Sequence, residues 1–220
     1  MRREQFAGAS KASASLVSPL ERRMARAVVP RIPLWLETHH LTLLTLLWCA
    51  GIVFFSRLAA ADLRWMWGVS AMIFLQYLTD FFDGKVGKHR GTGLVKWGFY
   101  MDHLLDYVFL CSVVIGYALV LPERALFGLL LVLAVYGGLM VNSFLTFAAT
   151  ERFEISHLKL GPTEFRIVLV VTNALLVSFG TRRMKAALPY VAAGSLVALC
   201  ILVYRTQKAL WRRDMEHKTQ

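Results

Sequence analysis

The chain has 220 residues, 57% of them hydrophobic, with a mean hydropathy of +0.53 and a formal net charge of +11 at pH 7. This composition is too apolar for a soluble domain, and several apolar runs of about 20 residues have the length of membrane spans. Because the basic residues lie in short segments between apolar runs, they indicate the orientation of a membrane protein and argue against a nucleic-acid-binding protein.

The first 33 residues are predicted to form a cytoplasmic tail followed by an amphipathic surface helix. Residues 1–14 are basic and rich in Ala and Ser, which is typical of a disordered tail. A capping box that begins at Ser18, with Pro at the first helical position, indicates a helix start. The helix then places three arginines opposite its apolar residues, namely Arg22, Arg23 and Arg26. This pattern predicts a helix on an anionic membrane surface, and a solvated soluble helix is the alternative.

Six membrane-spanning helices are predicted, so the expected fold is all-α and integral to a membrane. The spans cover approximately residues 40–60, 65–84, 97–121, 125–149, 164–180 and 186–204. They form one domain over residues 34–205, and residues 206–220 are expected to be a cytoplasmic C-terminal tail. With both termini cytoplasmic, most Lys and Arg residues obey the positive-inside rule, although Arg182, Arg183 and Lys185 do not. We expect a protein of a bacterial inner (cytoplasmic) membrane.

Four aspartates flank a basic, Gly-rich segment between the second and third predicted spans. Asp80 and Asp83 are three residues apart, and Asp102 and Asp106 are four apart, so each pair lies on one face of a helix. Two helices joined by a short loop are antiparallel, so the four carboxylates are expected to converge near the membrane surface. Each costs about 2.5–3.5 kcal/mol at bilayer depth on insertion scales. A hard divalent cation removes this cost and the mutual repulsion, which predicts a metal site.

The segment from Asp80 to Asp106 resembles the signature of the CDP-alcohol phosphotransferases, also called CDP-alcohol phosphatidyltransferases. The family pattern is D-x2-D-G-x2-A-R-x8–9-G-x3-D-x3-D, and this chain matches it at Asp80, Asp83, Gly84, Gly98, Asp102 and Asp106. It departs from the pattern where Gly87 replaces Ala and Lys88 replaces Arg. The resemblance implies that residues 34–205 are a membrane enzyme domain of phospholipid synthesis. Such an enzyme transfers a phosphoalcohol or phosphatidyl group from a CDP-alcohol donor to an acceptor hydroxyl and releases CMP.

The resemblance also implies what the four aspartates do. Asp80, Asp83, Asp102 and Asp106 are expected to hold Mg2+ or Mn2+, as two ions that bridge the donor diphosphate. Asp106 is also the expected general base for the acceptor hydroxyl. A purely structural ion site is the alternative. Lys88 and Arg90 are the cations expected near the carboxylates, and both are candidates to contact phosphate.

Four further residues are candidates for substrate binding besides Lys88. Gly84 and Gly98 lack side chains where a nucleotide could approach, and close helix packing is the alternative. Thr42 matches the last residue of a P-N-x-x-T pattern seen in many members and is a weaker candidate for the nucleotide site. Glu164 follows a Gly-Pro-Thr segment that resembles choline/ethanolamine phosphotransferases, which places it near the acceptor pocket. An ordinary helix start is the alternative for Glu164.

Several alternatives stay open at this point. The donor is either CDP-diacylglycerol with a small polar acceptor or a CDP-amino-alcohol with a lipid acceptor. The alternative from another class is a cation transporter or channel that uses the aspartates as its ion site. The absence of a matched pair of broken helices at the midplane argues against transport. Gly137 and Gly138 permit close helix packing, either within the chain or across a homodimer.

Overall fold

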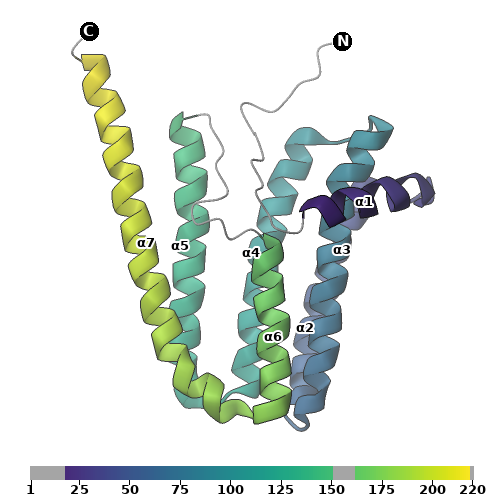
Figure 1. The fold of residues 1–220 in the computed structure, drawn as a ribbon, viewed down its shortest axis with the longest axis vertical. Coiled ribbons are helices and arrows are strands. Elements are labelled where there is room, and N and C mark those ends of the chain that lie inside the picture. The colour runs from purple at the N-terminus through teal and green to yellow at the C-terminus, as the bar shows by residue number, and fades with distance from the viewer. Residues whose placement is uncertain (1–17, 151–161, 219–220) are drawn as a thin grey trace.

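The structure, a computed structural model, describes residues 18–150 and 162–218, and every regular element in these two ranges is a helix. Consecutive long helices run antiparallel in a bundle (Figure 1). They are α2 (Thr38–Ala59), α3 (Met66–Arg90), α4 (Val95–Val120), α5 (Leu126–Thr150), α6 (Pro162–Phe179) and α7 (Thr181–Lys218). The predicted all-α fold is therefore confirmed. The predicted tail of residues 1–14 lies outside the described residues.

Four helical segments are long and apolar enough to cross a membrane, by length and composition. They are Thr38–Ala59, Val95–Val120, Glu123–Thr150 and Thr181–Glu216. These segments indicate an integral membrane protein, and they agree with four of the six predicted spans. The other two predicted spans correspond to α3 and α6, which carry charged side chains within their length, so the count of six stays a prediction. The last helix runs well past residue 204, where the sixth span was expected to end.

The core of the bundle lies where α2 packs against α3 and α4. Ile52, Met66 and Ile73 are at most 1% exposed there. A Cβ added to Gly116 of α4 would lie 2.5 Å from Ser56 Oγ of α2, which shows how closely these two helices approach. The second pairing is that of α7 with α5, where a Cβ on Gly138 would lie 3.0 Å from a methyl carbon of Leu199. Within the described chain, Gly138 therefore serves close helix packing.

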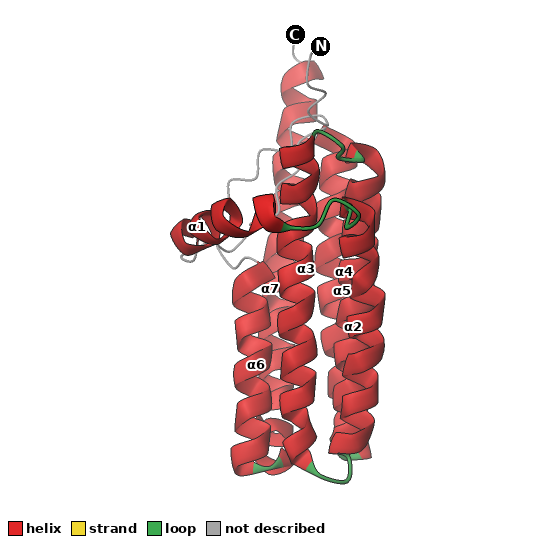
Figure 2. Ribbon diagram, turned by 90° about the vertical axis from the view of Figure 1, so that its right-hand side faces the viewer, coloured by secondary structure: helices red, strands yellow, loops and turns green. Residues whose placement is uncertain are grey.

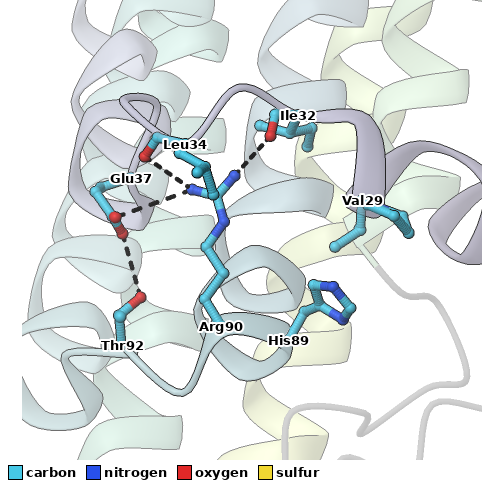
Figure 3. A pocket seen from close by; sticks show the side chains of 8 residues that line it. Val29, Ile32, Leu34, Glu37, His89, Arg90 and Thr92 are labelled. Carbon is cyan, nitrogen blue, oxygen red and sulfur yellow. Dashed lines mark hydrogen bonds and ion pairs between the residues drawn. The ribbon is translucent and has the colours of Figure 1, made fainter.

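A shorter helix, α1 (Ser18–Val28), lies crosswise to the long helices and projects from the side of the bundle (Figures 1 and 2). It is followed by a single 3-10 turn, η1 (Val29–Arg31). Arg90, at the end of α3, fastens the segment that leads from this turn to α2 (Figure 3). Its guanidinium lies within hydrogen-bonding reach of the carbonyl oxygens of Ile32, Pro33, Leu34 and Leu36, at 2.8 to 3.4 Å. Arg90 therefore holds the end of α3 to the segment before α2. The sequence analysis expected its guanidinium to contact phosphate, and the observed contacts are with these backbone carbonyls.

The helix that bears the first two aspartates is longer than predicted. The second span was expected to end near residue 84 and to be followed by a loop, but α3 continues to Arg90. Gly91 then ends the helix in a left-handed conformation (φ 70°), and the amide of Thr92 donates to the carbonyl of Gly87 at 3.2 Å. Only residues 91–94 connect α3 to α4. Lys88 therefore lies on a helix, and the loop expected around it is absent.

Gly87, one of the two departures from the family pattern, has a structural reason. A Cβ at this position would lie 2.7 Å from Thr38 Oγ1 and 3.0 Å from the Cα of Gly93. The end of α3 is thus pressed against both the start of α2 and the α3–α4 connection. Only a residue without a side chain fits there without a shift of the backbone.

We expect Gly87→Ala to destabilise the protein, because overpacking at a backbone contact costs about 1–3 kcal/mol. The midpoint of thermal unfolding of the purified protein in detergent should fall by several degrees. Gly84→Ala is the matched control, because a Cβ at Gly84 would meet nothing within 4 Å. That variant should be at least as stable as the wild type, since Ala favours a helix over Gly by about 1 kcal/mol. Equal midpoints for the two variants would contradict the packing argument.

Candidate functional site

Three carboxylates from two helices meet inside the bundle. Asp80 and Asp83 come from α3 and Asp102 from α4, and one oxygen of each lies within 4.8 Å of the others. Asp83 is buried and the other two are half-buried. The sequence predicted this convergence, because the helices are antiparallel and joined by a short connection. An all-oxygen donor set of this kind suits a hard divalent cation such as Mg2+ or Mn2+.

The carboxylate of Asp83 is held in place by the start of α2. Thr42 Oγ1 donates to Asp83 Oδ2 at 3.0 Å, and Thr38 Oγ1 donates to the carbonyl of Asp83 at 3.2 Å. The amide of Gly84 donates to the other carboxylate oxygen of Asp83. Thr42 was expected in the nucleotide site, and its observed contact is with this carboxylate. Hydrogen bonds of this kind orient carboxylates that bind metal ions.

The cation closest to the cluster comes from α6, and the sequence analysis did not identify it. Arg166 Nη2 lies 2.8 Å from Asp80 Oδ2 and 3.6 Å from Asp106 Oδ1. Its Nε donates to Gln76 Oε1 at 2.7 Å. Arg166 is 5% exposed and Gln76 is 1% exposed, so this network is buried. The expectation that Lys88 and Arg90 are the nearby counter-charges is therefore wrong.

Two signals in the sequence could have pointed to this network. Arg166 lies inside the fifth predicted span, and an ionisable residue at such a position marks a functional site by default. Gln76 precedes Asp80 by one helical turn, so the two share a face of α3. Neither signal predicts that Arg166 pairs with Asp80, because α3 and α6 are far apart in the sequence. The contact between Arg166 and Asp80 requires the start of α6 to lie level with Asp80, which is about 15 Å along α3 from the end of that helix. The start of α6 is also set down into the bundle (Figure 1).

Asp106 is not a member of the three-carboxylate group, although the sequence analysis expected all four aspartates to bind metal. It lies one turn beyond Asp102 on α4, and its side chain is 37% exposed. Arg166 Nη2 approaches Asp106 Oδ1 at 3.6 Å, and the same nitrogen lies nearer, at 2.8 Å, to Oδ2 of Asp80. Arg166 therefore lies between one carboxylate of the group of three and the fourth carboxylate. A metal-binding role for Asp106 stays a prediction.

The remaining candidates for substrate binding are not part of the three-carboxylate group. Lys88 is exposed on the last turn of α3 and makes no ion pair with the described residues. A Cβ added to Gly84 or Gly98 would meet nothing within 4 Å, so close helix packing does not account for either glycine. The space beside both is open, as the predicted approach of a nucleotide requires. Glu164 lies half-buried in the first turn of α6, where a helix start was expected.

A separate pocket of about 430 Å³ lies between the η1 turn and the end of α3. It is lined by Val29, Pro30, Ile32, Leu34, Glu37, His89, Arg90 and Thr92 (Figure 3). None of the four aspartates lines it. Its polar groups are engaged with one another, since Thr92 Oγ1 donates to Glu37 Oε2 at 3.2 Å and Arg90 lies 4.0 Å from Glu37. The pocket therefore belongs to the α1–α2 junction, and the carboxylates form a distinct site.

The comparison with known protein families agrees with this geometry. The sequence model of the CDP-alcohol phosphatidyltransferases matches residues 38–204, which is more than half of the chain. The match begins at the first residue of α2 and includes all four aspartates and Arg166. No curated protein matches the chain at a significant level of similarity.

We expect Thr42→Val to weaken binding of Mn2+ by at least about 10-fold, because loss of a hydrogen bond that orients a metal-binding carboxylate typically costs 10- to 100-fold in affinity. The measurement is the electron paramagnetic resonance signal of free Mn2+ during titration of the purified protein. Thr45→Val is the matched control, because Thr45 is equally buried on α2 one turn further along. Equal affinities for the two variants would show that the Thr42 contact does not support metal binding.

Proposed function

The chain belongs to the CDP-alcohol phosphatidyltransferase family and is therefore a transferase of phospholipid synthesis, and we propose that it transfers a phosphoalcohol or phosphatidyl group from a CDP-alcohol to an acceptor hydroxyl. The observation that carries the proposal is the group of three carboxylates, which falls on the family motif at Asp80, Asp83 and Asp102. Release of CMP is the expected signature of the reaction.

Asp80, Asp83 and Asp102 would hold the divalent ion, for which Mg2+ and Mn2+ both fit. When bound, the ion neutralises charge on the donor diphosphate and on the oxygen that leaves with CMP. The family resemblance implies two ions. The three carboxylates are pre-arranged for this task, because α2, α3 and α4 hold them by packing and by the hydrogen bonds to Asp83. The protein contributes position and charge, as is usual in phosphoryl transfer.

Asp106 is the group that we assign as general base. A carboxylate oxygen of Asp106 accepts the proton of the acceptor hydroxyl while the hydroxyl oxygen attacks the β-phosphorus. The bond from the β-phosphorus to the bridging oxygen breaks, and CMP leaves. Asp106 suits this role because it lies one turn beyond Asp102 on α4, further from the α3–α4 connection. Glu164, at the start of α6, is assigned to the acceptor side.

The donor nucleotide is assigned to the open space beside Gly84 and Gly98. The exposed Lys88 would reach its phosphates as a point charge, without the planar fork of the arginine usual in the family. Thr42 supports the donor site through Asp83. The identity of the alcohol, and whether donor or acceptor is the lipid, are left to lipid analysis of cells with and without the gene.

The proposed setting is a bacterial inner membrane crossed six times, with both termini in the cytoplasm and α1 on the cytoplasmic surface. The aspartates then face the compartment that contains CDP-alcohols. A homodimer is the proposed assembly, with the apolar outer surface of the bundle in contact with lipid.

We expect Asp106→Asn to lower the rate of CMP release by about 100-fold or more, the usual scale for a lost general base, while donor binding is largely kept. Lys88→Ala should mainly raise the Michaelis constant for the donor, since it acts on phosphate charge in the ground state. Asp80→Asn should abolish both turnover and donor binding. The measurements are initial rates of CMP release and donor binding by calorimetry. Loss of donor binding in Asp106→Asn equal to that in Asp80→Asn would make Asp106 a metal ligand, and Mn2+ binding without any CMP release from the wild type would favour a cation transporter.

The proposed topology predicts which surface each connection faces. Starting from a variant in which Cys49, Cys111 and Cys200 are replaced by Ser, a cysteine at Thr92 should react with a membrane-impermeant thiol reagent only from the cytoplasmic side. A cysteine at Glu123 should react only from the opposite side. Both residues are exposed, in the connections at opposite ends of α4. The reverse labelling pattern would overturn the orientation and the direct access of cytosolic donor.

A further inference from the structure

The segment between the η1 turn and α2 is folded around a single side chain. Residues 32–37 form no helix, so their backbone carbonyls need hydrogen-bond donors from elsewhere. The two Nη atoms of Arg90 lie 2.8 to 3.4 Å from four of these carbonyl oxygens, and the arginine side chain is only 11% exposed. A basic residue in the last turn of a helix commonly serves the carbonyls of its own helix. Arg90 instead serves a segment 54 to 58 residues earlier in the chain.

The residues that follow this segment reach the three-carboxylate group. Glu37 is the N-cap of α2, and its carboxylate accepts a hydrogen bond from Thr92 Oγ1, in the α3–α4 connection, at 3.2 Å. Thr38, the next residue, donates to the carbonyl of Asp83 at 3.2 Å. Thr42, one turn further on, donates to the Asp83 carboxylate at 3.0 Å. The start of α2 is therefore fastened on one side and in contact with Asp83 on the other.

The position of α2 decides whether Thr42 can reach Asp83. A hydrogen bond of 3.0 Å is lost when its two atoms move apart by about 0.5–1 Å, so a small shift of α2 would release the carboxylate. Close packing at Gly87 limits how near α2 comes to α3, but it does not stop α2 from moving away. The Arg90 guanidinium does, because its planar fork binds several carbonyls at once and fixes the segment in direction as well as in distance.

We propose that Arg90 is a positioning residue for metal binding. It fixes the start of α2, so that Thr42 directs the carboxylate of Asp83 at the ion. The inference rests on the proposed function, in which Asp80, Asp83 and Asp102 hold a divalent ion. Arg90 thus supports the donor site through the backbone and without a contact to phosphate.

The sign of one effect separates this role from a role of the arginine charge. Arg90→Met should weaken binding of Mn2+ by about 5-fold, less than Thr42→Val does, because Arg90 acts through that threonine. An arginine that acted only by its charge would have the opposite effect, since removal of a cation near carboxylates strengthens their attraction for Mn2+. Arg90→Lys keeps the charge but cannot reach the same set of carbonyls, so its affinity should lie between those of the wild type and Arg90→Met.

The test uses the full chain in lipid nanodiscs, titrated with MnCl2 in the absence of any CDP-alcohol and followed by the resonance signal of free Mn2+. Arg90→Met is measured alone and together with Thr42→Val. The double variant should bind Mn2+ no more weakly than Thr42→Val, because the two residues act in one chain of contacts.

Leu188→Ala is the control for a general loss of stability. Leu188 is 7% exposed and packs between α7 and α5 near the start of α7, at the end of the bundle away from the α3–α4 connection (Figure 1). The cavity left by this substitution should lower the midpoint of thermal unfolding. Mn2+ affinity should stay unchanged, because no contact of the carboxylates is lost.

Three outcomes would overturn the inference: unchanged or tighter Mn2+ binding by Arg90→Met, a further loss of affinity in the double variant relative to Thr42→Val, or an equal loss of affinity in Leu188→Ala. If Arg90→Met does not fold, Arg90→Lys decides. Weaker binding that disappears in the Thr42→Val background supports the inference, and unchanged binding contradicts it.

Failure of the proposed function is distinguishable from failure of this inference. Absence of CMP release from the wild type, with the expected Mn2+ pattern, would overturn the reaction alone. Normal CMP release without the Mn2+ pattern would overturn only the role of Arg90.

Discussion

Negative charge buried in a helical bundle is the constraint on which the rest of this structure depends. Asp80, Asp83 and Asp102 hold their oxygens within 4.8 Å of one another, about 10–15 Å along their helices from the α3–α4 connection. Such a group persists only where cations and hydrogen-bond donors offset its repulsion. The chain supplies donors from α2, through Thr38 and Thr42, and a cation from α6. The contacts with these carboxylates therefore help to position both α2 and α6.

The same constraint explains features at some distance from the aspartates. The start of α2 reaches Asp83 because Gly87 and Gly93 allow α3, α2 and the α3–α4 connection to approach closely. Arg90 then ties the segment before α2 to the end of α3 through its backbone carbonyls. The close connection of residues 91–94 in turn places α4 alongside α3 at the depth where Asp102 meets its partners.

The arginine from α6 connects the group of three carboxylates to the fourth. Arg166 Nη2 lies 2.8 Å from Asp80, a member of the group, and 3.6 Å from Asp106. Arg166 thus lies beside both carboxylates, and its Nε donates to the buried Gln76. A buried cation that is fixed in this way offsets part of the negative charge that α3 and α4 bring together.

The sequence by itself determined the helical fold, the pairing of the aspartates and the family, because these depend on spacing within single helices. Asp80 and Asp83, or Asp102 and Asp106, share a face by helix geometry alone, and a short connection makes their helices antiparallel. The length of α3 was predicted wrongly, because the Gly-rich segment after Asp83 was interpreted as a loop. The helix continues through Gly84 and Gly87 and ends only at Gly91, which is left-handed. Three contacts could be known only from the tertiary structure. They are the ion pair of Asp106 with Arg166, the hydrogen bonds from Arg90 to backbone carbonyls, and the hydrogen bond from Thr42 to Asp83. Arg166 lies 86 residues from Asp80, and no local periodicity states which faces of two distant helices meet. That choice is made by the packing of the whole bundle around its buried charge.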